Sequence, residues 1–433
     1  MKYYSTNKQA PVASLQEAVV KGLAADKGLF MPMSIKLLPQ DFYDTIDSLS
    51  FQEIAYRVAD AFFGEDIPAD TLKQIVYDTL SFDVPLVKVA DNIYSLELFH
   101  GPTLAFKDVG GRFMARLLGY FIKKEGQKNV NVLVATSGDT GSAVANGFLG
   151  VEGIHVYVLY PKGKVSEIQE KQFTTLGQNI TALEVDGTFD DCQALVKSAF
   201  MDKELNEHLS LTSANSINVA RFLPQAFYYF YAYAQLKRAG KADNAVICVP
   251  SGNFGNITAG LFGKKMGLPV KRFIAANNRN DIFYQYLQTG KYNPRPSVAT
   301  IANAMDVGDP SNFARVLDLY SGSHADISAE ISGTTYTDEQ IRETVKETWK
   351  EHHYLLDPHG ACGYRALVEG LKEGETGVFL ETAHPAKFLE TVESIIGEAV
   401  EIPAKLQEFM KGEKKSLQMT KEFADFKKYL LTL

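Results

Sequence analysis

The chain shows two different patterns of hydrophobic residues, which change at about residue 90. From about residue 90 onward, short apolar runs rich in β-branched and aromatic residues alternate with stretches in which apolar residues recur every three or four positions. The first pattern is typical of strands buried on both faces, and the second is typical of amphipathic helices. This alternation predicts an α/β fold, in which helices cover parallel sheets on both faces. The predicted strands span residues 93–99, 130–135, 154–160, 180–185, 245–249, 270–276 and 377–381.

The first ninety residues show the helical period instead. Ser14–Glu17 and Ser50–Glu53 have the capping-box pattern, in which glutamate follows three residues after serine. A third helix is predicted at 68–76, so this region predicts a small helical N-terminal domain. The predicted domains are an N-terminal helical domain over 1–90, an α/β catalytic region over 91–410 made of two subdomains, the smaller at about 120–220, and a C-terminal tail over 411–433.

Two later segments have unusual compositions. Residues 222–233 contain a run of five consecutive aromatic side chains. Because aromatic side chains dominate buried area, we expect a buried helix between layers or at a subunit interface rather than a ligand-stacking site. Residues 411–421 are polar and predict a solvated linker, and residues 425–433 predict a short amphipathic helix.

Composition and charge narrow the class of protein. The chain has 433 residues, 45% of them hydrophobic, and a formal net charge of −8, which argues against a nucleic-acid partner. Three scattered cysteines and eight histidines without ligand spacing predict neither a disulfide framework nor a metal site. No signal peptide and no stretch of ~18 apolar residues that could span a membrane is found. We expect a cytoplasmic monomer or homodimer without a membrane partner.

Lys107 lies at a predicted junction between a strand and a helix. The strand ends at Phe99, and the next helix is predicted over 109–122. Phe106 and small residues flank the lysine, and partial desolvation would favour the neutral, nucleophilic amine. Such an amine forms a Schiff base with a carbonyl, including the aldehyde of pyridoxal phosphate (PLP). Taken alone, the stretch is explained more simply by a solvated lysine in the first turn of a helix.

Four further junctions are rich in Gly, Ser, Thr and Asn, and ligands bind beyond the carboxyl ends of parallel strands. Small residues at 251–256 let the backbone wrap an anion, although a plain tight turn explains this loop equally well. The loop fits neither GxxxxGK[ST] nor GxGxxG, which disfavours a nucleoside triphosphate or a dinucleotide. Residues 136–141 either hold a carboxylate or phosphate or simply cap a helix. Residues 212–221 offer either an oxyanion clamp or helix caps, and the fourth junction spans 381–387.

Taken together, these junctions resemble the motifs of the threonine synthase family. The stretch Phe99–Asp108 is similar to the cofactor-lysine motif of that family, and the other motifs follow in the family's order. The resemblance runs from about residue 3 to about residue 403. It implies a PLP-dependent enzyme of fold type II, with the tryptophan-synthase-β-like fold, that converts O-phospho-L-homoserine and water to L-threonine and phosphate. The other similar stretches are Gly28–Pro32, Ala135–Gly141, Ser213–Asn218, Pro250–Gly255, Asn303–Val307 and Thr382–Phe388.

The resemblance also implies roles for single residues. Lys107 would be the catalytic residue and would carry the cofactor as a Schiff base, and Thr382 would hydrogen-bond the pyridine nitrogen. Asp139 would contact the phenolic oxygen of the cofactor, where related enzymes often carry asparagine, and an ionised carboxylate cannot donate a hydrogen bond. The residues implied for the cofactor phosphate are Gly252, Asn253, Phe254, Gly255 and Asn256. Those implied for the substrate are Thr136, Ser137 and Thr140 at its carboxylate and Asn215, Ser216 and Arg221 at its phosphate.

Other functions compete with this one. A PLP-dependent dehydratase or β-replacement enzyme acting on serine or threonine would have no use for a second anion site at 215–221. Phosphate release against ammonia release separates these two enzymes. A non-catalytic module that binds phosphate or an amino acid could keep the fold, and a colourless purified protein would favour it. A dinucleotide-dependent dehydrogenase is disfavoured because the chain lacks GxGxxG followed by an acidic residue.

Overall fold

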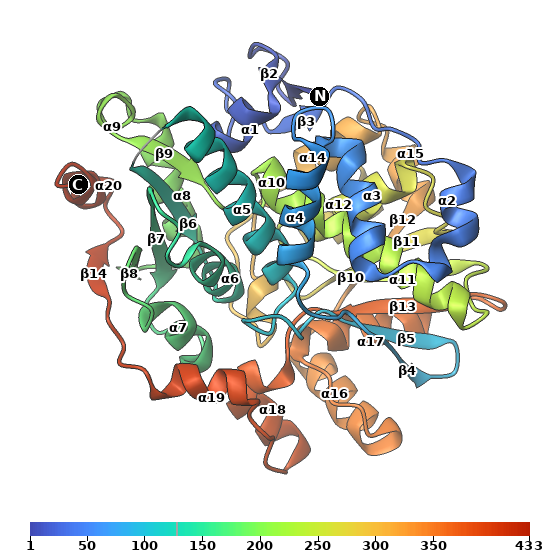
Figure 1. The fold of residues 1–433 in the computed structure, drawn as a ribbon. Coiled ribbons are helices and arrows are strands. Elements are labelled where there is room, and N and C mark those ends of the chain that lie inside the picture. Colours follow the sequence, from blue (N-terminus) through green and yellow to red (C-terminus); the bar gives the residue numbers. More distant parts are fainter. Residues whose placement is uncertain (127–128) are drawn as a thin grey trace. The chain divides into compact units, whose positions relative to one another are not determined.

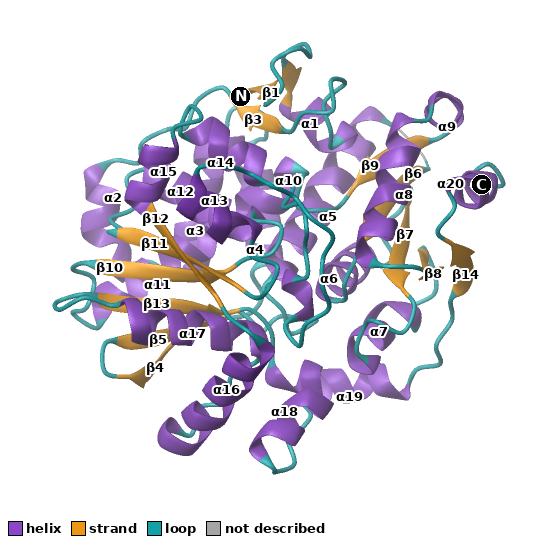
Figure 2. Cartoon of the chain, turned by 180° about the vertical axis from the view of Figure 1, so that it is seen from behind, coloured by secondary structure: helices purple, strands orange, loops and turns teal. Residues whose placement is uncertain are grey.

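The computed structural model describes residues 1–126 and 129–433, and these residues form two compact units (Figures 1 and 2). Each unit holds a mainly parallel sheet with helices packed on it, which confirms the predicted α/β class. The first ninety residues contribute to both units, and the predicted domain boundaries stay a prediction. Unit 1 comprises Met1, Met31–Phe106 and Phe222–Glu401, and unit 2 comprises Lys2–Phe30, Lys107–Arg221 and Ile402–Leu433.

Unit 1 is built on a six-stranded sheet. The strand order is β12-β11-β10-β13-β5-β4, and all neighbours are parallel except β4, which is antiparallel to β5. The edge strands β4 and β12 are only partly buried, so they lack the continuous apolar run that reveals a central strand in the sequence. The strands are β4 (Leu86–Ala90), β5 (Ile93–Glu97), β10 (Ala245–Pro250), β11 (Arg272–Asn277), β12 (Ile331–Thr335) and β13 (Thr376–Glu381).

Helices cover both faces of this sheet. On β11, Phe273 faces α11 (Ala226–Arg238) and packs edge-on against Tyr229 at 6.2 Å. The next residue, Ile274, joins the core under α17 (Pro358–Gly370), as strand alternation requires. Figure 1 shows α17 on one side of β13. The other helices of unit 1 are α2 (Gln40–Thr45), α3 (Phe51–Phe63), α4 (Ala69–Thr79), α12 (Gly255–Lys265), α13 (Ile282–Thr289), α14 (Phe313–Leu319), α15 (His324–Glu330), α16 (Asp338–His352) and α18 (Leu389–Ile396), with short 3-10 turns at Ile46–Ser48, Leu223–Gln225, Asn303–Met305 and Pro385–Phe388.

The aromatic run forms part of α11, and the prediction of a buried helix is confirmed. Residues 226–230 are fully buried within the chain, where α11 packs against α3 and α12. The hydroxyl of Tyr229 donates to the carbonyl of Asn256, 2.6 Å away. The run therefore belongs to the core of unit 1, and it also contacts the start of α12.

Unit 2 is built on a five-stranded sheet in which every pair is parallel, in the order β14-β8-β7-β6-β9. Helices α6 and α8 pack on its central strands β6 and β7. The strands are β6 (Val130–Ala135), β7 (Ile154–Pro161), β8 (Ile180–Asp186), β9 (Ser210–Ser213) and β14 (Leu417–Thr420), and the helices are α1 (Leu15–Lys21), α5 (Lys107–Glu125), α6 (Asp139–Phe148), α7 (Glu167–Thr174), α8 (Phe189–Met201), α9 (Lys203–His208), α19 (Ala404–Lys411) and α20 (Phe423–Leu430). Helix α10 (Val219–Phe222) and the N-terminal strands β1 (Lys2–Ser5), β2 (Ala13–Ser14) and β3 (Phe30–Pro32) complete the described elements.

The prediction of a linker at 411–421 is wrong for residues 417–420, which form strand β14, whereas the prediction that the segment is solvated is confirmed because most of its residues are exposed. Strand β14 pairs in parallel register with β8, and Leu417 lies opposite Leu183. Lys414 bridges Glu170 and Glu184 at 2.6 and 3.1 Å. Gln418 of this edge strand donates to the buried carboxylate of Glu184, which also contacts Ser416 and Lys414 just before the strand. The polar composition of the segment resembles that of a solvated loop when the sequence is examined alone.

The predicted capping boxes are both confirmed. Ser14 accepts a hydrogen bond from the backbone of Glu17, whose carboxylate bonds back to Ser14 N, and Ser50 and Glu53 repeat the arrangement. Among the residues that the structure describes, no helix is long and apolar enough to cross a membrane. Over the same residues, no three His, Cys, Asp or Glu side chains are grouped to hold a metal ion.

Candidate active site

The loop between β10 and α12 in unit 1 presents unused backbone donors. Across residues 1–126 and 129–433, no acceptor is found for the backbone N–H groups of residues 252–256. Phe254 adopts a left-handed conformation with φ of 66°, and α12 begins at the next residue. Free N–H groups at the start of an eleven-residue helix, with its positive dipole end, form a site for an anion.

Side chains hold this loop open rather than filling it. Asn256 donates to the carbonyl of Pro250 at 2.9 Å and accepts from the hydroxyl of Ser251 at 2.6 Å. Asn253 accepts from Ser311 Oγ at 3.1 Å through its side chain, and its carbonyl accepts from the backbone of Asn312 at 3.0 Å. The amides of both asparagines therefore fix the loop. The predicted role of residues 252–256 in cofactor binding stays a prediction.

Thr382 directly follows β13, at the same edge of the sheet as this loop. Strands β10 and β13 pair with Cys248 opposite Phe379, and extending that register by three residues brings Ser251 opposite Thr382. Thr382 is 5% exposed, and no described residue makes a hydrogen bond with its hydroxyl. The edge of the sheet thus pairs an anion-binding loop with a free hydroxyl group.

The segment that precedes Lys107 is fixed next to Thr382 within unit 1. The backbone of Phe106 donates to the carbonyl of Thr382 at 2.8 Å, and His384 N donates to Leu104 O at 3.0 Å. Lys387, which is fully buried, donates to the carbonyl of Thr103 at 2.8 Å. Burial lowers the pKa of His384 to about 4, with a further contribution from His100, so its imidazole is neutral at neutral pH. Its Nδ1 accepts from Ala386 N.

Lys107 is the first residue of α5 in unit 2, directly after this fixed segment in the sequence. Its carbonyl accepts a hydrogen bond from Arg221 Nη1 at 3.4 Å. Arg221 is 1% exposed, and its Nε donates to the carbonyl of Ala214 at 2.7 Å. The structure therefore brings Arg221 to the backbone of Lys107. The expected interaction of Arg221 with a substrate anion stays a prediction.

The junctions at 136–141 and 212–218 meet within unit 2. Asn215 donates to the carbonyl of Ala135 at 2.8 Å and accepts from its backbone N–H at 3.2 Å. Thr136 Oγ1 accepts from the backbones of Gly138 and Gly141, so it acts as a helix cap. Ser137, Thr140 and Ser216 belong to the same two junctions at the carboxyl ends of the parallel strands β6 and β9. Two predicted substrate-binding segments thus lie side by side.

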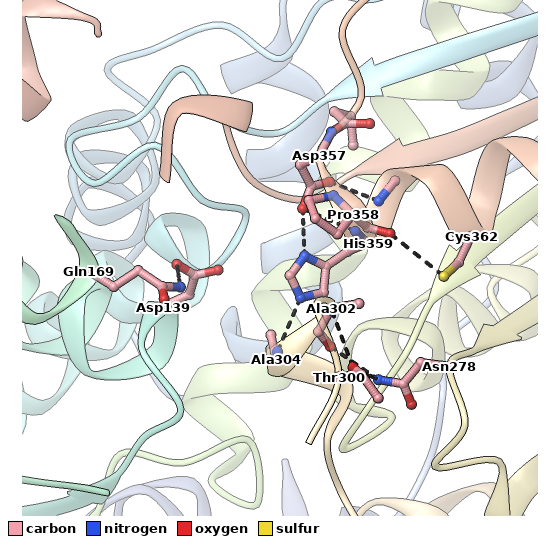
Figure 3. A network of polar contacts seen from close by, with 12 residues as sticks. Asp139, Gln169, Asn278, Thr300, Ala302, Ala304, Asp357, Pro358, His359 and Cys362 are labelled. Atoms are coloured by element: carbon pink, nitrogen blue, oxygen red, sulfur yellow. Dashed lines mark hydrogen bonds and ion pairs between the residues drawn. The ribbon is translucent and has the colours of Figure 1, made fainter. Parts of the chain in front are cut away.

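Asp139 begins α6 and is 2% exposed. Gln169 Nε2 donates to Asp139 Oδ1 at 3.0 Å, as Figure 3 shows, and Gln169 itself is fully buried at the start of α7. In the sequence, the Ser166–Gln169 spacing signals only a helix start, and nothing local indicates the contact of Gln169 with another helix. The expected contact of Asp139 with a cofactor stays a prediction.

A buried acidic network in unit 1 was also missed. Asp357 caps α17, accepts from the backbones of His359 and Gly360, and bonds His359 Nδ1 at 2.5 Å (Figure 3). Glu381, fully buried, accepts from Asp357 N at 2.8 Å. Burial and the charge of Asp357 raise the pKa of Glu381 well above its usual range, which favours the neutral carboxyl. The Asp357-Pro358 pair signals a helix start in the sequence, but nothing local shows that the following histidine is buried.

Comparison with known proteins shows the family to which the chain belongs. A family model described as "Pyridoxal-phosphate dependent enzyme" matches residues 84–382, and models for the threonine synthase N terminus and C-terminal region match residues 2–80 and 360–430. A threonine synthase of Haemophilus influenzae is 45% identical over the whole length of both chains. The crystal structure of threonine synthase from Escherichia coli matches with a TM-score of 0.95, 44% identity and full coverage of both chains. The PLP-bound threonine synthase from Brucella melitensis matches with a TM-score of 0.91 and 36% identity, covering 99% of this chain and 98% of that one. The chain belongs to the PLP-dependent threonine synthase family.

Proposed function

We propose that this protein converts O-phospho-L-homoserine and water to L-threonine and phosphate, as a carbon–oxygen lyase of the cytoplasm. Membership of the threonine synthase family supports the reaction, and the three free cysteines fit a reducing compartment. The structural observation that carries the proposal is the pair formed by the unused N–H groups of residues 252–256 and the free hydroxyl of Thr382. One edge of one sheet thereby offers an anion site and a polar contact for an aromatic ring.

These residues fit PLP. The N–H groups of residues 252–256 would hold its phosphate, Thr382 would hydrogen-bond its ring nitrogen, and Lys107 would bind its aldehyde. When bound, PLP would supply an electron sink for chemistry at the substrate Cα. The amine of Lys107 would take the proton from Cα and move protons along the substrate chain, with phosphate leaving from Cγ and water adding at Cβ.

The remaining predicted residues would position the substrate. Ser137 and Thr140 stand at the start of α6, where helix N–H groups favour a carboxylate. Asn215, Ser216 and Arg221 lie at the neighbouring junction, and we assign the substrate phosphate to them. Asn215 makes two hydrogen bonds to the backbone of Ala135, so a shift of one junction must move the other. This coupling would align the two ends of one substrate.

The proposal is tested with the purified protein and its Lys107→Ala variant. We expect the wild-type protein to be coloured by PLP and to release phosphate from O-phosphohomoserine, with L-threonine as the organic product. Lys107→Ala should lose the covalent absorbance band and all turnover, because no other amine replaces its nucleophile and base. Borohydride reduction followed by peptide mapping should place the cofactor on Lys107. Ammonia release from threonine without phosphate release, or a label on another lysine, would overturn the assignment.

A further inference from the structure

Asp357 and His359 form a closed hydrogen-bonded pair inside unit 1. Asp357 is fully buried and His359 is 2% exposed. Burial alone would raise the pKa of Asp357, but electrostatic attraction by His359, together with hydrogen bonds from His359 and from the backbone of Gly360, holds that pKa below its usual range. Gly360 itself has no room for a side chain, since a Cβ there would lie 1.8 Å from Glu381 Oε2. The pair is therefore held rigidly at the start of α17.

The second ring nitrogen of His359 has a definite partner. The backbone N–H of Ala304 donates to His359 Nε2 at 3.1 Å (Figure 3). A nitrogen that accepts from an N–H carries no proton of its own, so the proton of the neutral ring lies on Nδ1 and points at Asp357. Asp357 thus selects the tautomer in which His359 Nε2 carries no proton and can accept a hydrogen bond from the backbone N–H of Ala304.

Ala304 belongs to the segment that packs against Gly252 of the anion-binding loop. A Cβ on Gly252 would lie 2.7 Å from the carbonyl of Ala304 and 3.0 Å from Met305 Cα, so the two segments touch along their backbones. Beyond Met305, Asp306 accepts hydrogen bonds from Asn278 at 2.9 Å and from Thr300 Oγ1 at 2.6 Å. The segment 304–306 is therefore held at Ala304 by His359 and at Asp306 by Asn278 and Thr300.

We propose that His359, oriented by Asp357, is a positioning residue for the cofactor phosphate, acting through the Ala304–Met305 backbone that supports Gly252. This inference rests on the proposed function, in which residues 252–256 hold the phosphate of PLP. Free N–H groups bind an anion well only when their directions are fixed before binding, because ordering the loop afterwards lowers the affinity. A histidine without contact to the ligand can therefore determine how tightly the phosphate is held.

Two substitutions separate the two bonds of His359. In His359→Gln, the side-chain oxygen reaches the position of Nε2 and still accepts from Ala304, while the bond to Asp357 is lost. In His359→Asn, the shorter amide reaches only the position of Nδ1 and keeps a partner in Asp357 while Ala304 loses its acceptor. The exposed His352 at the end of α16 gives the matched control, His352→Gln. Thermal unfolding of all three variants shows whether each is folded.

The measurement is the dissociation constant of PLP, obtained by dialysing each holoenzyme to equilibrium against graded PLP and recording cofactor absorbance. We expect His359→Asn to weaken PLP binding by about tenfold, the effect of one lost buried hydrogen bond. His359→Gln and His352→Gln should stay within about twofold of wild type. Pyridoxal, which lacks the phosphate, should bind His359→Asn as it binds wild type. Nitrogen-15 NMR should show the His359 proton on Nδ1.

Equal weakening of PLP binding by the Asn and Gln variants would overturn the inference, and so would unchanged binding in both. Weakening of pyridoxal binding to the same extent as PLP binding would also overturn it, because the phosphate would not be the group affected. A wild-type protein that takes up no PLP would instead contradict the proposed function. The two failures are therefore distinguishable.

Discussion

At the residue scale, Arg221 is the side chain whose role the structure makes most specific. It is buried, and two of its donors bind the carbonyls of Ala214 and Lys107. The residue thus joins the predicted substrate junction to the backbone of the predicted catalytic lysine. Guanidinium donors in a rigid fork can hold backbone and anion together, which a lysine ammonium cannot do with the same geometry.

Replacing Arg221 tests the proposed phosphate site. We expect Arg221→Ala to lower turnover of O-phosphohomoserine by at least ~100-fold, because expulsion of phosphate needs fixed positive charge where negative charge develops. Arg221→Lys keeps the charge without the fork and should fall between the alanine variant and wild type. Steady-state phosphate release measures turnover, and circular dichroism checks the fold. Near-normal turnover in Arg221→Ala would remove Arg221 from this role.

His384 gives a pH-dependent prediction at the same scale. Its pKa is about 4 in the folded protein, below the usual 6.5, so the unfolded chain binds more protons between these values. The stability that depends on the neutral ring is present above pH 6.5 and is lost as the pH falls towards 4. His384→Asn keeps an acceptor for Ala386 N but does not titrate, so it should be less sensitive to acid. Relative to wild type, it should gain about 1 kcal/mol of unfolding free energy between pH 7 and 5, allowing for partial exposure.

Urea denaturation at the two pH values measures this difference. His384 packs edge-on against Phe99 at 5.1 Å, and Phe99 is retained in the variant. The substitution therefore changes this packing equally at both pH values, so a uniform loss of stability would reflect packing alone. The prediction concerns only the change with pH. The same loss in wild type and variant on going from pH 7 to pH 5 would show that His384 is not the titrating group.

At the element scale, local signals account for what could be predicted from the sequence. The buried central strands and the capping boxes at Ser14 and Ser50 have signatures within a few residues, so they could be located without tertiary information. The predicted loop at 251–256 follows directly from one of those strand ends, whereas the free hydroxyl of Thr382 is seen only in the structure. The α/β class rests on the same regular alternation.

Elements that depend on distant partners could not be predicted. Strand β14 pairs with β8, and Lys414, Ser416 and Gln418 contact the buried Glu184 of β8, more than two hundred residues earlier in the sequence. Likewise, the contacts of Asn215 and Gln169 depend on which strand ends lie next to each other. Hydrophobic periodicity carries no such information, because it reports only which face of an element is buried. The residues named for the site therefore stay predictions, and the contacts that support them could not be predicted from periodicity.

At the scale of the whole molecule, the chain passes between the two units at 1/2, 30/31, 106/107, 221/222 and 401/402. Two of these crossings adjoin the residues with the most specific predicted chemistry, since Lys107 and Arg221 are the first and last residues of one segment of unit 2. Each unit has its own sheet and its own buried side chains. The units should therefore be able to unfold as separate cooperative blocks.

The three cysteines can report this behaviour without any mutation. Cys192 lies in unit 2, whereas Cys248 and Cys362 share one core cluster of unit 1. All three are buried, and burial raises the pKa of each thiol, so none should react with a thiol reagent in the folded protein. Pulse labelling at increasing urea, read by peptide mass spectrometry, should give one midpoint shared by Cys248 and Cys362 and a different midpoint for Cys192. A single midpoint for all three thiols would show that the two units unfold as one, and rapid labelling without urea would contradict their burial.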